Sequence, residues 1–359
     1  MPSFDIVRKT TPSESFRVNG VRGMFGLQAK EIQEHFCGNF ALPEKWNIGL
    51  IVGRSGTGKT TIAKELFDAN LVSGYEWTHD NILDDMPKSA TIKDITSVLT
   101  SVGFSSPPSW LKPFSVLSNG EKMRCEIARA MLADDDFFAF DEYTSVVDRN
   151  IAKVSSLAIQ KAIRRKEKKF IAITCHYDVE EYLMPDWVFC TDDMTFSLLN
   201  YEEQKKNRPE FKIEIYETEN KIQFWEMFRK YHYLSNSFNK AARVFIALCN
   251  GVLCGFNAVL PFPHPRKKNT YRLHRTVVFP DFQGIGIGTA LTDFVAEIFK
   301  DEGRKIITTT SNPARVHALK KNPKWRTTNI GRSSKLGKTS SYEGGIVSRN
   351  RLTFSFEYL

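Results

Sequence analysis

The stretch Gly53-Arg54-Ser55-Gly56-Thr57-Gly58-Lys59-Thr60 decides the fold of the first part of this chain. It fits the phosphate-binding pattern G-x-x-x-x-G-K-[ST] at every fixed position. An apolar run, Ile48 to Val52, precedes it, and a helical pattern from Thr61 to Asn70 follows. This context predicts a buried strand, a glycine turn and a helix start, which place backbone N–H groups around phosphate oxygens. An incidental glycine-rich turn is disfavoured because pattern and context agree.

The residue types in this loop suit a nucleoside triphosphate with Mg²⁺. Lys59 would reach the β- and γ-phosphates, and the Thr60 hydroxyl would bind the metal. We therefore predict that the nucleotide is bound by Gly53, Ser55, Gly56, Gly58, Lys59, Thr60 and Thr61.

Two segments downstream add to this site. Leu117-Ser118-Asn119-Gly120-Glu121 opens a helix that runs to about Leu132, with Ser118 and Glu121 spaced as in a capping box. Phe137 to Glu142 then predicts a short strand that ends in two carboxylates. Asp141 would hold Mg²⁺ together with Thr60, and Glu142 would polarise the attacking water.

Other segments predict the surrounding elements. Ser89 to Gly103 has helical spacing, whereas Ser15-Phe16-Arg17-Val18 and Tyr75-Glu76-Trp77 are predicted to be strands.

In their order, these motifs resemble those of the ATP-binding-cassette (ABC) ATPases. The loop 53–60 is similar to the Walker A motif, 117–121 to the LSGGQ signature, 137–142 to the Walker B strand and 144–148 to the D-loop. The strand 170–174 leads to His176, where the family has its switch histidine. The resemblance implies that Glu142 and His176 are catalytic, His176 as a sensor of the γ-phosphate. A histidine packed in the core is the alternative.

The resemblance also implies an assembly. In this family two cassettes close head to tail on two ATP molecules, so Ser118 and Gly120 of one copy would bind the γ-phosphate held by Lys59 of the other. Asp148 of the D-loop would lie at the same interface. We expect an ATP-dependent homodimer.

The sequence departs from the family at several points. Asn119 and Glu121 replace a glycine and a glutamine, and no glutamine occurs between Thr61 and Ile159 to serve as the Q-loop residue. The segment between Walker A and the signature is also short. These features argue against a transporter subunit and are compatible with hydrolysis.

The second half has a different order of elements. After a polar linker at 201–210 we predict a strand at 211–216, a helix at 221–231 and a hairpin around Asn250-Gly251. A strand from Arg272 to Val278 then leads to the glycine turn 283–288 and a helix from Thr289 to about Lys300. A dinucleotide-binding fold is the usual rival for such glycine spacing, but the antiparallel hairpin does not suit a βαβ unit.

This order resembles the GNAT acyltransferases. Gln283-x-x-Gly286-x-Gly288 matches the family's acyl-coenzyme A loop, with a following strand at 305–309 and a helix from Ser311-Asn312-Pro313. The resemblance implies acetyl-CoA or another acyl-CoA as cofactor, with the pantetheine arm along Val277 and Val278. Its implied binding residues are Val277, Val278, Gln283, Gly284, Gly286, Gly288 and Thr289.

The chemistry of transfer is less defined. A family tyrosine that protonates the leaving thiolate would fall near Leu319 or Lys320, and no tyrosine is there. His232 and His274 are candidate bases, although both are also compatible with structural roles.

Charge separates the two halves. Residues 201–359 hold 27 Lys and Arg against 14 Asp and Glu, whereas residues 1–200 hold 23 against 27. From Arg315 to Arg351 there are ten basic residues against Glu343 alone, and 266–268 adds three. This face suits nucleic acid, with a solvated basic surface as the alternative.

The hydropathy pattern and the N-terminal sequence favour a cytoplasmic protein. We find no apolar run long enough to cross a bilayer and no signal peptide, so no membrane association is expected. The six scattered cysteines indicate neither a disulfide framework nor a zinc site.

Together these patterns predict an α/β ABC-type cassette at 1–200, with a mixed sheet, a linker at 201–210 and an α+β GNAT-like domain at 211–359. The leading hypothesis is an ATPase whose dimerisation controls acyl transfer, plausibly to nucleic acid. The alternative is a nucleic-acid maintenance or defence ATPase whose second domain only binds.

Overall fold

The computed structural model describes residues 3–27, 32–39, 41–232, 237–265, 268–332 and 351–359. They fold into two compact units that alternate along the chain. Unit 1 consists of Met1–Gly74, Asp134–Ser145 and Lys166–Asn207, and unit 2 of Tyr75–Ala133, Val146–Arg165 and Arg208–Leu359. The last change of unit falls inside the predicted linker, which contains a short helix, α8 (Tyr201–Asn207). The predicted domains at 1–200 and 211–359 stay a prediction.

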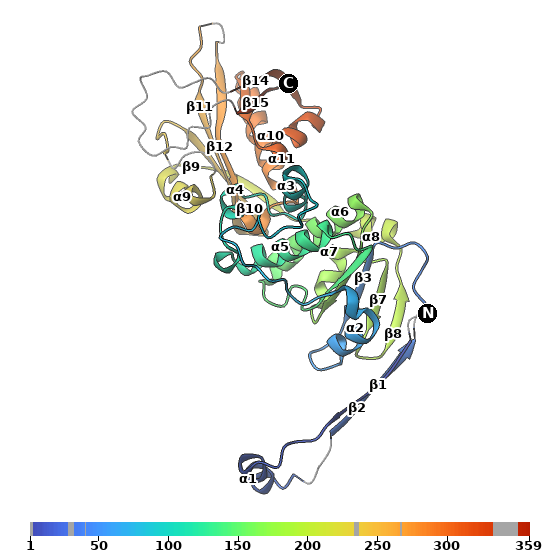
Figure 1. The fold of residues 1–359 in the computed structure, drawn as a ribbon. Helices are drawn as coiled ribbons and strands as arrows, with labels where there is room; N and C mark the ends of the chain where they lie inside the picture. The colour runs from blue at the N-terminus through green and yellow to red at the C-terminus, as the bar shows by residue number, and fades with distance from the viewer. Residues whose placement is uncertain (1–2, 28–31, 40, 233–236, 266–267, 333–350) are drawn as a thin grey trace. The chain divides into compact units, whose positions relative to one another are not determined.

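Unit 1 is built on a six-stranded sheet in the order β4-β5-β6-β3-β7-β8. Figure 1 labels β3, β7 and β8 of this sheet. Neighbouring strands are parallel except β7 and β8, so the sheet is mixed as predicted. β3 is buried at every position, which suits a central strand covered on both faces. The strands are β3 (Ile48–Val52), β4 (Leu71–Val72), β5 (Phe137–Phe140), β6 (Lys169–Thr174), β7 (Trp187–Cys190) and β8 (Thr195–Leu198).

The helix after β3 packs on this sheet. α2 (Lys59–Phe67) buries Ile62, Ala63 and Phe67 in one cluster with residues of β3 and β6. The other short helices of this unit are η1 (Asp68–Asn70), η3 (Tyr177–Val179) and α7 (Glu180–Leu183).

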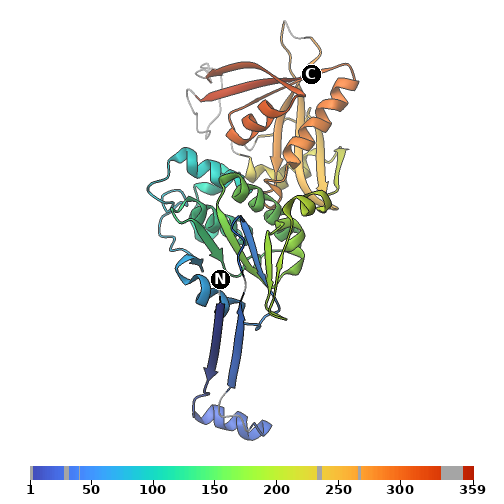
Figure 2. The ribbon, with the colours of Figure 1, turned by 90° about the vertical axis from the view of Figure 1, so that its right-hand side faces the viewer.

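A two-stranded ribbon precedes the sheet (Figure 2). It consists of β1 (Ser3–Thr10) and β2 (Ile32–Asn39), and α1 (Phe16–Phe25) connects them. The predicted strand at Ser15–Val18 is therefore wrong. Ser15 caps a helix by accepting a hydrogen bond from the backbone N–H of Val18, and Gly26, with φ of 63°, ends it. A local cap decides here because no residue of α1 is buried.

Unit 2 contains a seven-stranded sheet in the order β14-β15-β13-β12-β11-β10-β9. The predicted hairpin is confirmed: β10 and β11 pair antiparallel around Asn250 and Gly251, whose φ angles are 49° and 80°. The strands are β9 (Ile213–Thr218), β10 (Arg243–Cys249), β11 (Val252–Pro261), β12 (Thr270–Val278), β13 (Lys305–Thr310), β14 (Trp325–Arg332) and β15 (Leu352–Tyr358).

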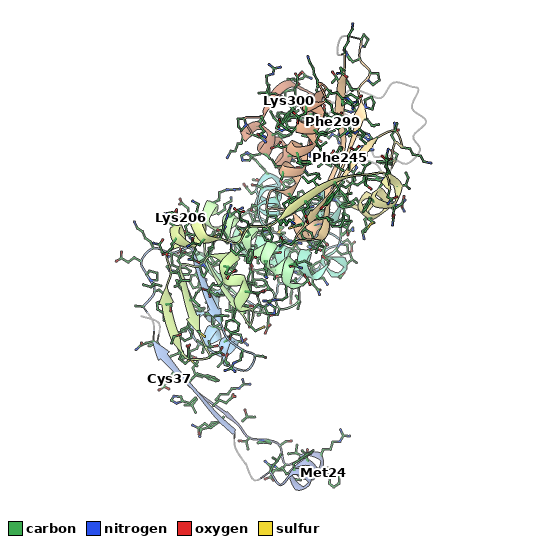
Figure 3. The ribbon with its side chains drawn as sticks, turned by 180° about the vertical axis from the view of Figure 1, so that it is seen from behind. Met24, Cys37, Lys206, Phe245, Phe299 and Lys300 are labelled. Carbon is green, nitrogen blue, oxygen red and sulfur yellow. The ribbon has the colours of Figure 1, made fainter. Side chains whose placement is uncertain are left out.

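Helices from distant parts of the chain complete unit 2. α10 packs on the sheet, as shown by Phe299 against Phe245, with ring centroids 6.3 Å apart (Figure 3). Val154 of α6 belongs to the same apolar cluster, although it precedes the sheet by about 60 residues in sequence. The helices are α3 (Ile92–Ser101), α4 (Pro107–Trp110), η2 (Phe114–Val116), α5 (Asn119–Leu132), α6 (Arg149–Lys166), α9 (Lys221–Phe228), η4 (Arg229–Tyr231), η5 (Pro280–Phe282), α10 (Ile287–Asp301) and α11 (Pro313–Lys321).

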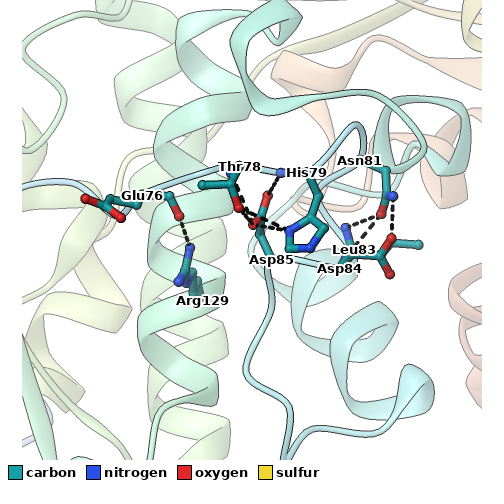
Figure 4. Close-up of polar contacts among 8 residues, drawn as sticks. All are labelled: Glu76, Thr78, His79, Asn81, Leu83, Asp84, Asp85 and Arg129. Atoms are coloured by element: carbon teal, nitrogen blue, oxygen red, sulfur yellow. Dashed lines mark hydrogen bonds and ion pairs between the residues drawn. The ribbon is translucent and has the colours of Figure 1, made fainter.

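The segment before α3 is irregular, so the predicted strand at Tyr75–Trp77 is also wrong. The carboxylate of Glu126 accepts from the Tyr75 backbone N–H and from Trp77 Nε1, in place of ladder hydrogen bonds. The chain then turns around Asp85, which accepts from the backbone N–H groups of Thr78 and His79 (Figure 4). Side-chain acceptors satisfy the backbone here, so no partner strand is needed.

Candidate functional site

The phosphate loop leaves β3 and enters α2 through two left-handed glycines. Gly56 and Gly58 have φ of 87° and 86°, which L side chains rarely adopt. Lys59 Nζ donates to the carbonyl oxygens of Gly53 and Arg54 at 2.8 and 2.7 Å. The ammonium group therefore lies within the loop, where an anion between the loop and the start of α2 would meet it.

Close packing explains why position 53 of the motif is a glycine. A Cβ atom at Gly53 would lie 2.1 Å from Thr191 Oγ1, so the loop closes against the end of β7. Ser55 is exposed on the loop, and Thr61 is half-buried in the first turn of α2. All seven nucleotide-binding residues predicted in this motif lie in one turn and one helix start.

The two predicted Mg²⁺ ligands face each other. Thr60 Oγ1 donates to Asp141 Oδ1 at 3.3 Å, which joins the start of α2 to the end of β5. A hydroxyl and a carboxylate are hard oxygen ligands, and Mg²⁺ binds few protein groups because it keeps waters and phosphate oxygens. These residues fit the metal.

The predicted catalytic residues lie on the turn after β5 and the end of β6. Glu142 is exposed and has φ of 54°. Thr144, with φ of 64°, is buried, and its Oγ1 lies 3.1 Å from His176 Nδ1. A β-branched residue with positive φ is an outlier, and such strain is characteristic of functional turns. His176 thus contacts the strained turn that follows the acidic pair.

The signature segment opens α5 in unit 2. Ser118 Oγ accepts from the Glu121 backbone N–H at 3.3 Å, and the Glu121 carboxylate accepts from the Ser118 N–H at 3.0 Å, which confirms the predicted capping box. Glu121 is buried and also accepts from Ser109 Oγ. The carboxylate that departs from the family pattern is therefore a capping group, and it leaves Ser118 and Asn119 exposed at the helix start.

Two other predicted nucleotide residues also lie in unit 2. Asp148 is exposed just before α6, where its Oδ1 accepts from the Asn150 backbone N–H. Gly120 is buried, and a Cβ atom there would lie 3.0 Å from Asp281 Oδ1.

The second glycine turn borders a cavity of about 430 Å³ in unit 2. β12 and β13 pair in parallel only from Thr270–Lys305 to Leu273–Thr308, so both strands continue beyond their last paired residues. Residues near these ends line the cavity. All seven predicted acyl-CoA residues line it: Val277, Val278, Gln283, Gly284, Gly286, Gly288 and Thr289.

The turn presents bare backbone to this cavity. Gly286 has φ of 101°, and a Cβ atom there would meet no atom within 4 Å. At Gly288 the nearest atom would belong to Val278, at 3.5 Å. The turn opens α10, whose first N–H groups lack helical partners. This arrangement fits a pyrophosphate, and the cavity volume is within the usual range for small-molecule sites.

Gln283 has a further role that the motif did not indicate. Its Oε1 accepts from the Ser105 backbone N–H at 2.7 Å, and its Nε2 donates to the Val278 carbonyl at 2.9 Å. Its amide thus fastens the turn to the segment after α3.

Sequence reasoning missed one wall of the cavity. It is formed by Thr100, Ser101, Ser105, Pro107, Lys161, Ala162 and Arg165, from the segments around α3, α4 and α6. Periodicity predicted the helix at 89–103, which includes Thr100 and Ser101, but no prediction covered α6. No local signal tied either helix to a turn more than 100 residues away.

The two candidate bases differ in position. His232 lines the cavity beside Tyr231, whereas His274 does not line it. Burial, followed by the charges of Arg275 and Arg272, lowers the pKa of His274 to about 4. Leu319 and Ala318 line the cavity where the family tyrosine was expected.

Comparison with known proteins separates the two parts of the chain. Residues 201–322 match the model of the acetyltransferase (GNAT) family. A probable ATP-binding cassette sub-family F member 3 homolog of Encephalitozoon cuniculi is 30% identical over 105 residues, which are 28% of this chain and 19% of that protein. The methionine import ATP-binding protein MetN 2 of Paraburkholderia xenovorans is 28% identical over 167 residues, covering 35% of this chain and 42% of that protein.

The chain joins an ABC-type ATP-binding region to a GNAT-family domain. It spans less than half the length of either curated relative.

Two solved structures each match part of this chain at a low TM-score. An IAA acetyltransferase from Bacillus cereus is 21% identical, with a TM-score of 0.32. The match covers 41% of this chain and 99% of the acetyltransferase chain. A bacterial Atm1-family ABC exporter with ATP bound is 17% identical, with a TM-score of 0.35. That match covers 50% of this chain and 39% of the exporter chain. Within the described residues, no helix combines the length and the apolar character needed to cross a bilayer.

The predicted nucleic-acid surface falls largely on residues that are not described. Of the basic stretch 315–351, residues 333–350 lie outside the described part, as do 266 and 267. Nucleic-acid binding therefore stays a prediction.

Proposed function

We propose that this chain binds and hydrolyses ATP, and that ATP-driven dimerisation controls an acyl-CoA-dependent transfer at the GNAT domain. The observation that carries this proposal is the ion pair between Arg124 of α5 and Asp281 of η5. Arg124 Nη2 lies 3.0 Å from Asp281 Oδ1, and the Arg124 side chain is 0% exposed. The helix that begins at the signature is thus tied to the segment that enters the acyl-CoA turn.

The ATP half of the proposal assigns a role to each residue. Lys59 and the loop N–H groups hold the phosphates, and Thr60 and Asp141 hold Mg²⁺, which neutralises developing charge on the phosphates. Glu142 orients and polarises the attacking water, and His176, fixed by Thr144, contacts the γ-phosphate.

Closure of two copies would engage Ser118 and Asp148 in unit 2. Both lie next to helices that reach the acyl-CoA turn. α5 contacts Asp281, and α6 carries Ser155, whose Oγ accepts from Arg124 Nη1 at 2.9 Å. Dimerisation acting on these helices is therefore placed to change the affinity of the turn.

The transfer half assigns the cavity to the acyl-CoA. An acceptor nucleophile attacks the thioester carbonyl carbon, its bond to that carbon forms, and the carbon–sulfur bond breaks. His232 takes the proton that the acceptor loses, and the thiolate of coenzyme A gains a proton from Tyr231 or water. We propose ATP, Mg²⁺ and acetyl-CoA, or another acyl-CoA, as the ligands, and a cytoplasmic homodimer as the working form.

One experiment tests the coupling. The Glu142→Gln variant should bind ATP without hydrolysing it and remain dimeric. We expect the dissociation constant of acetyl-CoA, measured by calorimetry with ATP and Mg²⁺ present or absent, to differ about fivefold or more. Equal constants would exclude ATP control, and no binding in either state would exclude the transferase function.

A second function is favoured by Leu319, which lines the cavity where the family has its tyrosine. In that case the chain is a nucleic-acid maintenance or defence ATPase whose GNAT domain only binds. Labelled acetyl-CoA incubated with DNA, RNA and the protein itself separates the two. Transfer of label to any of them contradicts the binding-only function, and its absence from all three favours it.

A further inference from the structure

We propose that Lys161 and Arg165, on helix α6 of the ABC-type region, bind the phosphate groups of coenzyme A. This inference rests on the proposed function of the cavity and adds residues that neither the GNAT motif nor the ABC motifs contain. All groups involved belong to unit 2.

The position of α6 is fixed by packing along one helical face. Val154 is part of the apolar cluster that includes Phe282, just before the acyl-CoA turn, and Ile287, within it. One turn later, the Ala158 Cβ atom lies 2.8 Å from where a Cβ at Gly284 would stand. The bare glycine thus allows α6 to approach the turn closely.

The next residues on this face enter the cavity. Lys161, Ala162 and Arg165 follow Ala158 at helical spacing, and all three line the cavity. Since Lys161 is three residues beyond Ala158, its backbone lies about 4.5 Å further along the axis. Its flexible stem keeps the ammonium group within reach of a phosphate held by the turn.

The charged side chains in the described lining of the cavity are basic. Its described lining includes Lys161, Arg165 and Arg315 but no aspartate or glutamate. Within the described part of the chain, the side chains of Lys161 and Arg165 form no hydrogen bond or ion pair. Burial, then the charges of Arg208 and Arg165, lower the pKa of Lys161. Cations gathered without a carboxylate favour an anionic ligand.

Coenzyme A has the matching distribution of charge. Its phosphates lie in the nucleotide part of the molecule, whereas its pantetheine arm is uncharged. Val277 and Val278, which precede the turn and line the same cavity, are uncharged too. The turn itself, 283–288, has no cationic side chain. A phosphate held by its N–H groups would meet a cationic donor only from neighbouring segments.

The test compares ligands with and without phosphate. Lys161→Met and Arg165→Met keep the aliphatic stem and remove the charge. We expect each to weaken acetyl-CoA binding about tenfold in calorimetry, and the double variant to weaken it further. Binding of S-acetylpantetheine, which has no phosphate, should be unchanged. Lys166→Met, on the same helix but outside the lining, is the matched control for net charge and should behave as wild type.

The outcomes separate this inference from the proposed function. If wild type binds acetyl-CoA and both variants bind it equally well, with native melting curves, this inference is wrong and the proposed function stands. If the variants lose binding of a single-stranded oligonucleotide but keep that of acetyl-CoA, the cations serve nucleic acid and the inference is also wrong. If wild type does not bind acetyl-CoA, both fail. Tenfold weaker binding without any acyl transfer supports the inference and contradicts only the transfer step.

Discussion

The two glycine turns of this chain are both predicted to bind phosphate groups, but they differ in whether the turn contains a cation. The turn at 53–60 includes its own cation, because Lys59 lies within the loop and bonds to the Gly53 carbonyl. The turn at 283–288 has no cation and is packed against the segment after α3, through Gly103, and against α6, through Ala158. Both loops can be recognised from sequence, but the segments that complete the second one, around Gly103 and Ala158, become apparent only in the tertiary structure.

Removal of the Glu142 carboxylate should have the largest effect. In Glu142→Gln the amide cannot accept the proton of the attacking water, so we expect ATP hydrolysis to fall about 10²–10⁴-fold. Phosphate release measures this loss. Binding of acetyl-CoA without ATP should remain at the wild-type value, and a large change there would show that the two turns are not separate sites.

The two partners of the Arg124–Asp281 pair should differ in how much stability is lost when each is replaced. Asp281→Ala leaves the fully buried Arg124 charge unpaired at that end, and we expect a loss of about 3 kcal/mol in the free energy of unfolding. Arg124→Met leaves Asp281, which is 32% exposed, open to hydration, and should cost less. Denaturant unfolding measures both variants. Equal losses would contradict this account of the pair.

Alanine at matched glycines compares the two turns directly. Gly56 and Gly284 have φ of 87° and 86°, but only at Gly284 would an added Cβ atom meet neighbours within 4 Å, the nearest being Ala158 at 2.8 Å. We expect Gly56→Ala to cost about 1 kcal/mol through backbone strain alone. Gly284→Ala should cost about 2 kcal/mol because a clash is added. Similar denaturation midpoints would mean that α6 moves away at no cost.

The smallest effect should come from outside both turns. The hydrogen bond to Asp85 raises the pKa of His79, so the stability it contributes is present below the ordinary histidine pKa and lost as pH rises through the higher folded value. Burial would raise the pKa of Asp85, but hydrogen bonds from His79 and Thr78 outweigh it and lower the pKa, so that contribution is lost only in acid.

We therefore expect His79→Ala to lower the melting temperature at pH 6 more than at pH 8.5. Thermal melts of both proteins at the two pH values measure the difference. ATP and acetyl-CoA affinities should not change. A decrease in melting temperature confined to pH 8.5 would contradict a raised pKa of His79.

Several elements were predictable because their signals are local. The capping box at Ser118 and Glu121, the Asn250-Gly251 hairpin and the Asn312 cap of α11 each depend on residues within a few positions. The strands predicted at Ser15–Val18 and Tyr75–Trp77 were wrong because side chains satisfy the backbone there. A cap and a distant acceptor, Glu126, supplied hydrogen bonds that the apolar pattern did not indicate.

By itself, the sequence determined the two glycine turns, because positive φ at Gly56, Gly58, Gly284 and Gly286 is a property of the residue type. It also determined the order of motifs that separates the ABC-type region from the GNAT domain. Only the tertiary structure decided that the compact units interleave and that α6 forms a wall of the acyl-CoA cavity. Contacts such as Ala158 with Gly284 depend on the complementary shape of surfaces more than 100 residues apart, which periodicity along one helix cannot encode.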